Sequence, residues 1–230
     1  MQTRFYPIAL MLFLGTGLTP IYSTAQPVLV PDYTEVTDER LLNPEAHNWL
    51  SYRGTLDGWG FSRLNEIDDS NVQQLEPVWS FSTGVLGGHE APPIVNNGVM
   101  FVTTPRNLVY AIDAASGDLL WRYQHDLPET YIAFHRTNRG VALYGDKVYT
   151  ATLDARVVAL DASTGRKVWD STVQDNNFGY YITMAPLAID GKILVGTSGG
   201  ELGIRGFVVA LDAETGEAVS YTHLTLPTRY

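Results

Sequence analysis

Cysteine is absent from this chain of 230 residues. Its absence excludes disulfides, thiolate metal sites and a lipid-modified cysteine anchor within the sequence. It also excludes a covalently attached haem, because that linkage needs a Cys-x-x-Cys-His motif. A haem of that kind would therefore have to belong to another polypeptide or to sequence outside these residues.

Basic residues are few and scattered singly, with 15 Lys and Arg against 25 Asp and Glu and a formal net charge of −10. This balance argues against nucleic-acid binding, which needs a basic patch. The five histidines share no ligand spacing such as His-x-x-x-His. A zinc or copper site built from this chain alone is therefore not expected.

Long apolar runs are missing as well. The apolar stretch near the N-terminus, residues 8–14, is too short to span a bilayer. Arg4 precedes it, and Ser23, Thr24 and Ala25 are small residues suited to cleavage. We expect residues 1–25 to be a signal peptide cleaved after Ala25, which predicts a periplasmic protein with no transmembrane span after cleavage. An uncleaved anchor is the alternative.

One phrase occurs three times in what remains. Asp113, Asp161 and Asp212 each follow an apolar run and precede a glycine four residues later, and they lie 48 and 51 positions apart. The Asp can bond backbone amides and open a turn, and the glycine closes it, so each phrase is typical of a hairpin. Trp121 and Trp169 follow the first two copies by eight residues. We interpret them as core side chains that fill the gap between adjacent sheets.

A second hairpin precedes each phrase. Apolar runs in residues 93–102, 140–149 and 185–195 are split by Asn-Gly, Gly-Asp and Asp-Gly, which favour tight turns. Two hairpins per period make a four-stranded antiparallel unit, and helical periodicity is hard to find after residue 75. The sequence therefore predicts an all-β protein, a partial β-propeller of three to four blades, with a straight solenoid of sheets as the weaker alternative.

The segments around these repeats are less regular. Residues 26–75 read as an irregular N-terminal segment, and 76–219 as the propeller repeats, with Trp79 closing an earlier, degenerate blade. After the third phrase the pattern calls for Trp at position 220, where Ser220 stands instead. Residues 220–230 show no strand alternation, so we expect an anomalous tail that is foreign to the natural protein. A genuine divergent tail is the alternative.

The order of segments resembles the quinoprotein alcohol dehydrogenases, secreted enzymes that use pyrroloquinoline quinone (PQQ) and a metal ion on an eight-bladed propeller. The resemblance covers about residues 45 to 217, and its most specific part is the stretch Ser-Gly-Gly-Glu-Leu-Gly-Ile-Arg-Gly over residues 198–206. The repeated Asp-Ala-x-Thr-Gly phrase is shared by many propellers, including ones without a cofactor. It therefore indicates the fold and says little about catalysis.

The resemblance implies a set of site residues. PQQ carries three carboxylates, so an acidic protein that binds it needs a placed cation, and Arg139 matches the quinone-contacting arginine of the family. Glu201 matches the metal-ligating glutamate, and calcium or a lanthanide is the implied ion. The remaining cofactor-binding positions are Glu90, Thr183, Ser198, Gly199 and Gly200.

The chain also departs from the family. Many members carry two adjacent cysteines, joined by a disulfide, that cover one face of PQQ, where this chain has Ala133 and Phe134. A phenylalanine is able to stack on the ring in their place. The catalytic aspartate, the metal-ligating asparagine and the tryptophan under PQQ come after the matched region in the family. We therefore expect an N-terminal part of an enzyme, inactive alone.

The resemblance implies a small alcohol as substrate and a periplasmic cytochrome c as electron acceptor. Two other functions stay open at this stage. One is a cofactor-free propeller that serves as a scaffold or binding module of the cell envelope, and the other is a quinoprotein that acts on sugars or polyols. Convergence of Glu90, Arg139, Thr183 and Glu201 at one place in the fold would favour an enzyme, whereas their dispersal over the surface would favour the scaffold.

Overall fold

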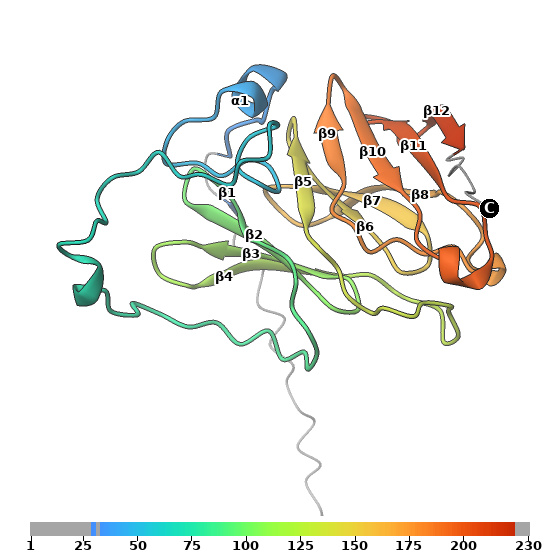
Figure 1. The fold of residues 1–230 in the computed structure, drawn as a ribbon, viewed down its shortest axis with the longest axis horizontal. Helices are drawn as coiled ribbons and strands as arrows, with labels where there is room; N and C mark the ends of the chain where they lie inside the picture. Colours follow the sequence, from blue (N-terminus) through green and yellow to red (C-terminus); the bar gives the residue numbers. More distant parts are fainter. Residues whose placement is uncertain (1–28, 31–32, 224–230) are drawn as a thin grey trace, which may run out of the picture.

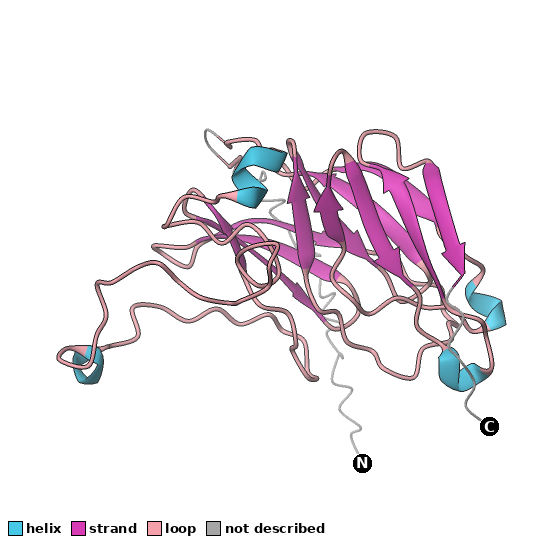
Figure 2. Ribbon diagram, turned by 45° about the horizontal axis from the view of Figure 1, so that its top comes forward, coloured by secondary structure: helices cyan, strands magenta, loops and turns pink. Residues whose placement is uncertain are grey.

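The computed structural model describes residues 29–30 and 33–223, so the predicted signal peptide and the last seven residues of the predicted tail lie outside the described residues. Twelve strands form three four-stranded antiparallel sheets, each with its strands in chain order. The sheets stand side by side, as Figures 1 and 2 show. This arrangement confirms the all-β prediction of a partial propeller.

Each sheet is one blade of the repeat. Blade 1 has β1 (Ile94–Asn96), β2 (Val99–Thr104), β3 (Leu108–Asp113) and β4 (Leu119–Gln124). Blade 2 has β5 (Val141–Tyr144), β6 (Lys147–Ala151), β7 (Arg156–Asp161) and β8 (Lys167–Thr172). Blade 3 has β9 (Leu187–Ile189), β10 (Lys192–Gly196), β11 (Phe207–Asp212) and β12 (Ala218–His223). Both hairpins predicted for every repeat are present.

The repeated aspartates act as predicted. The side chain of Asp113 accepts hydrogen bonds from the backbone N–H groups of Ala115 and Ser116 at 2.9 and 2.8 Å. Asp161 and Asp212 hold their turns in the same way. These bonds are formed with the charged carboxylate, and the bond from the Ser116 N–H is the main reason that the pKa of Asp113 lies below its usual range.

The repeated tryptophans join neighbouring blades. Trp121 of blade 1 donates its indole N–H to the carbonyl of Ala162 in blade 2 at 2.9 Å, and Trp169 does the same to Ala213 in blade 3 at 3.0 Å. Each indole also lies against the turn glycine of the next blade. A Cβ added to Gly165 would fall 2.6 Å from Trp121 Cε3, too close for any other residue.

Trp79 makes the same contact from outside a strand. Its indole N–H donates to the Ala114 carbonyl at 3.1 Å, and its ring lies 2.7 Å from the position of a Cβ on Gly117. Residues 76–93 contain no strand, and Phe81 and Val85 pack beside Trp79 against Tyr110 and Ile112 of blade 1, so this segment covers blade 1 without forming a sheet of its own.

Blade 3 ends in a strand without a tryptophan. Ser220 pairs with Ala210 at the position where Trp121 pairs with Ala111 and Trp169 with Ala159, so it does stand in the tryptophan position. Residues 220–223 of the predicted tail form the last four residues of β12, although the sequence there shows no strand alternation. Every residue of β12 is exposed, so this outermost strand has no burial alternation that a sequence pattern could show.

The N-terminal segment covers the first strands of the blades. Its regular elements are α1 (Asp38–Leu42) and the 3₁₀ turn η1 (Val72–Gln74). Bridges pair Val36 with Gly145 and Trp49 with Val95, and buried Leu41 and Leu50 belong to the common core. The part that carries η1 extends away from the sheets (Figures 1 and 2). The remaining 3₁₀ turns are η2 (Asn176–Phe178) and η3 (Gly200–Leu202).

Candidate functional site

Arg139 lies just before β5 and reaches two predicted partners. Its backbone N–H donates to the Thr183 carbonyl at 3.0 Å, which joins the segment before β5 to the segment before β9. Its Nη1 donates to Thr183 Oγ1 at 2.6 Å, and its Nη2 forms an ion pair with Glu90 Oε2 at 2.9 Å. The Arg139 side chain is 38% exposed and that of Glu90 46%. Part of the guanidinium therefore remains accessible to an oxygen-rich ligand.

Ser198 extends this group from the end of β10. Its backbone N–H donates to the Tyr181 carbonyl at 2.7 Å, which fixes the strand end against the segment that carries Thr183. Its hydroxyl oxygen then lies 3.4 Å from Thr183 Oγ1. Glu90, Arg139, Thr183 and Ser198 therefore form one continuous polar row, although they come from four separate places in the sequence.

The two glycines that follow differ in their role. Gly199 has φ +116°, and a Cβ there would overlap the carbonyl oxygen of Gly179, so the packing of the chain itself requires glycine. A Cβ on Gly200 would meet no atom within 4 Å. The surface beside Gly200 is therefore open, as a backbone that borders a ligand needs to be.

Glu201 is held by a residue that the sequence did not indicate. It lies in η3, and its Oε1 accepts a hydrogen bond from the hydroxyl of Tyr181, which is 1% exposed. Burial, followed by the nearby Glu201 carboxylate, raises the pKa of Tyr181 to about 12. The same hydrogen bond is the main reason that the pKa of Glu201 is lowered. Glu201 is thus held as a carboxylate with one oxygen engaged.

Tyr181 carries a signal that could have revealed it. It stands two residues before Thr183 on extended backbone, and alternate residues of such a segment share a face. A site that includes Thr183 therefore has Tyr181 as its neighbour on that face.

Phe134, the residue predicted to stack on the PQQ ring, is 63% exposed.

A pocket of about 300 Å³ adjoins Arg139. The pocket is lined by residues of β5, by residues 184–188 and by four residues of the N-terminal segment, Leu41, Leu50, Ser51 and Tyr52. Among these described lining residues Arg139 alone is charged, so Arg139 belongs both to the polar row and to the lining of this otherwise uncharged pocket. No helix in the described part of the chain is long and apolar enough to cross a membrane.

Comparison with known proteins gives a family for this site. The family described as PQQ: Glucose/ethanol/alcohol dehydrogenase, beta-propeller domain matches residues 49–219, which is most of the chain. The chain belongs to the PQQ-dependent alcohol dehydrogenase family. This PQQ-family chain is 43% identical over 185 residues to the quinohemoprotein alcohol dehydrogenase ADH IIB of Pseudomonas putida, covering 78% of this chain and 26% of the relative.

Two further members are similar. The 1-butanol dehydrogenase (cytochrome c) of Thauera butanivorans is 42% identical over 159 residues, which cover 67% of this chain and 23% of the relative. The structure of a europium-containing methanol dehydrogenase superposes with a TM-score of 0.78 at 37% identity, over 82% of this chain and 34% of that one. The chain spans about a quarter of the length of these curated relatives.

The residues of this PQQ-family chain fit the quinone cofactor. PQQ presents carboxylate and quinone oxygens, and the polar row offers one guanidinium and two hydroxyl groups as donors beside the open surface at Gly200. Glu90 already pairs with Arg139, which holds the guanidinium in place without covering it fully.

The fit to a metal ion is partial. A hard cation takes six or more oxygen ligands, and Glu201 supplies one carboxylate. Residues 33–223 contain no group of three or more His, Asp or Glu side chains that could hold a metal ion. Glu201 therefore suits a metal site only as one ligand among others that these residues do not provide.

Proposed function

We propose that this chain is the N-terminal part of a periplasmic PQQ-dependent alcohol dehydrogenase. The enzyme oxidises small alcohols to aldehydes with PQQ and a calcium or lanthanide ion, and passes the electrons to cytochrome c. The observation that carries the proposal is the continuous row Glu90–Arg139–Thr183–Ser198 in a chain of this family. Residues dispersed over the surface would instead have suited a cofactor-free scaffold.

The row supplies the binding chemistry. Arg139 is a fixed positive charge in a protein of net charge −10, and its bonds to Thr183 and Glu90 orient the planar guanidinium before a ligand arrives. When bound, PQQ supplies an ortho-quinone that accepts a hydride from the alcohol carbon, and the metal ion polarises the accepting carbonyl. Preorganised donors of this kind cost little reorganisation when charge develops on the bound group.

Glu201 and Tyr181 supply one corner of the metal site. The Tyr181 hydroxyl engages Oε1 of Glu201, and among the described residues Oε2 makes no hydrogen bond that would compete with a cation. Members of the family are named for butanol, methanol and other alcohols, and one is named for cytochrome c. The names of these relatives support an alcohol as substrate and cytochrome c as acceptor.

The resemblance to the family implies that the catalytic base, an aspartate, lies after the matched residues. Because hydride removal from an alcohol needs a base for the hydroxyl proton, we expect the residues described here to bind cofactor without turnover. The full-length enzyme, of which we propose this chain to be a part, is therefore the protein to test.

Arg139→Ala in the full-length apoenzyme tests the proposal. A hydrogen bond to a charged group contributes about 1.5–3 kcal/mol, so PQQ should bind about 10- to 100-fold more weakly in a titration followed by quinone absorbance. Arg122→Ala, an exposed arginine on β4, is the matched control and should leave the affinity unchanged. Lack of PQQ binding by the wild-type enzyme, or equal affinity in both variants, would refute the proposal.

A further inference from the structure

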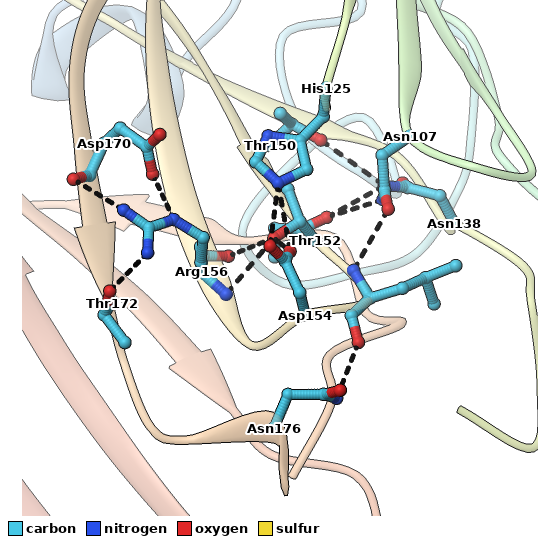
Figure 3. A network of polar contacts seen from close by, with 12 residues as sticks. Asn107, His125, Asn138, Thr150, Thr152, Asp154, Arg156, Asp170, Thr172 and Asn176 are labelled. Atoms are coloured by element: carbon cyan, nitrogen blue, oxygen red, sulfur yellow. Dashed lines mark hydrogen bonds and ion pairs between the residues drawn. The ribbon is translucent and has the colours of Figure 1, made fainter. Parts of the chain in front are cut away.

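Asn138, the residue before Arg139, is 1% exposed and uses its full hydrogen-bonding capacity. Its Oδ1 accepts from Thr103 Oγ1 and from the Gly140 N–H, both at 2.9 Å. Its Nδ2 donates to Thr150 Oγ1 at 3.3 Å and to the Ala151 carbonyl at 3.0 Å. Figure 3 shows Asn138 near Thr150 and Asn107, within a larger network of polar contacts. A buried amide with all four positions satisfied has a single stable orientation.

These partners place Asn138 between two blades. Thr103 lies on β2 of blade 1, whereas Thr150 and Ala151 lie on β6 of blade 2. The start of β5 is therefore fixed to both sheets through one side chain. Fully satisfied polar contacts of this kind stiffen the backbone that carries them.

The bond from Asn138 to Gly140 spans Arg139. An Asn side chain that accepts from the backbone two residues ahead closes an Asx turn, and Arg139 is the residue enclosed in it. The Arg139 N–H is held by the Thr183 carbonyl at the same time. The backbone of Arg139 is thus fixed on both sides, which determines where its long side chain starts.

We propose that Asn138 is a positioning residue for PQQ binding, which acts by holding Arg139 where its guanidinium meets the cofactor. The inference rests on the proposed function. Asn138 touches neither Glu90 nor the polar hydroxyls of the row, so its effect on the ligand passes through Arg139.

Asn107 provides a matched control. It is 0% exposed, donates to the same Ala151 carbonyl at 3.2 Å and accepts from the Leu153 N–H at 3.0 Å. It also links blade 1 to blade 2, as Figure 3 shows. It makes no hydrogen bond to residues 138–140. A merely structural role between blades therefore predicts the same behaviour for both asparagines.

The test compares Asn138→Ala, Asn107→Ala and Arg139→Ala in the full-length enzyme. Each apoenzyme is titrated with PQQ and its melting temperature is measured. We expect both asparagine variants to melt at lower temperature, but only Asn138→Ala to bind PQQ about 10-fold more weakly. The double variant Asn138→Ala/Arg139→Ala should bind no worse than Arg139→Ala alone, because the two residues act through one contact.

A milder variant covers the case in which Asn138→Ala fails to fold. Thr103→Val keeps the side-chain shape and removes one donor to Asn138 Oδ1, so it should weaken PQQ binding in the same direction and less strongly. Equal PQQ affinity in Thr103→Val and wild type, or equal losses in the Asn138 and Asn107 variants, would overturn the inference. If Arg139→Ala binds PQQ as well as wild type, the proposed function fails first.

Discussion

Replacing Gly165 by Ala should uncouple blade 1 from blade 2. The turn glycine has φ +70°, where an alanine costs about 1 kcal/mol more than glycine. Its new Cβ would fall 2.6 and 2.7 Å from Cε3 and Cδ2 of Trp121, so the indole must move. Overpacking of this kind costs about 1–3 kcal/mol.

The displaced indole also loses its hydrogen bond. Trp121 is 3% exposed, and its N–H donates to the Ala162 carbonyl at 2.9 Å. Breaking a buried bond of this type costs about 1 kcal/mol or more. The three contributions together predict a loss of about 3–5 kcal/mol in the free energy of unfolding.

Gly191→Ala isolates the contribution of the tryptophan. Gly191 has φ +68°, and a Cβ there would meet no atom within 4 Å, so only the backbone cost of about 1 kcal/mol applies. Equilibrium urea unfolding of both variants, followed by tryptophan fluorescence, measures the difference. Equal losses of stability in the two alanine variants would refute the reasoning, because they would show that the contact between Trp121 and Gly165 contributes nothing.

Two further predictions concern single polar contacts. Tyr181→Phe removes the donor to Glu201 and should weaken metal binding of the full-length enzyme about 10-fold, as measured by terbium luminescence. The neighbouring Tyr180→Phe is the control and should leave metal binding unchanged. Equal terbium affinities of the two variants would contradict the role given to Tyr181. The pKa of Asp154 is lowered because hydrogen bonds from His125 and Thr152 outweigh the opposing effect of burial. A carboxyl whose pKa is depressed on folding stabilises the protein above its ordinary value near 3.8 and loses that contribution as pH falls. Thermal unfolding from pH 6 to about 3 should therefore show a smaller decrease in melting temperature for Asp154→Asn than for wild type, and parallel curves would count against this pairing.

The fold could be predicted in detail because its signals are local. The Asn97-Gly98 turn between two apolar runs and the carboxylate of Asp113 each act within a few residues, and both hairpins form where these signals predict them. The general role of Trp121 as a filler between sheets was predicted as well. Its partner Gly165 was not, because the contact joins residues 44 positions apart through a packing that no local pattern encodes.

The candidate site was predictable only in part. The resemblance named Arg139 and Thr183, and the structure brings the two into contact. Tyr181 acts on Glu201 from a buried position and carries no charge that marks its role, and Asn138 acts on Arg139 through hydrogen bonds that the sequence does not show. Residues 220–223 carry no alternation that marks a strand, because the outermost strand β12 forms through backbone pairing and needs no buried face.

The contacts between blades have a direction. Blades 1 and 2 each present an indole to the blade that follows, and blades 2 and 3 each present a glycine to the blade before, so blade 2 carries both halves of the joint. Duplicating or deleting blade 2 therefore leaves every joint with a complementary partner, whereas a single insertion between its aspartate and its tryptophan shifts the indole off its glycine. Such a propeller is able to change its number of blades during evolution more easily than the length of any one blade.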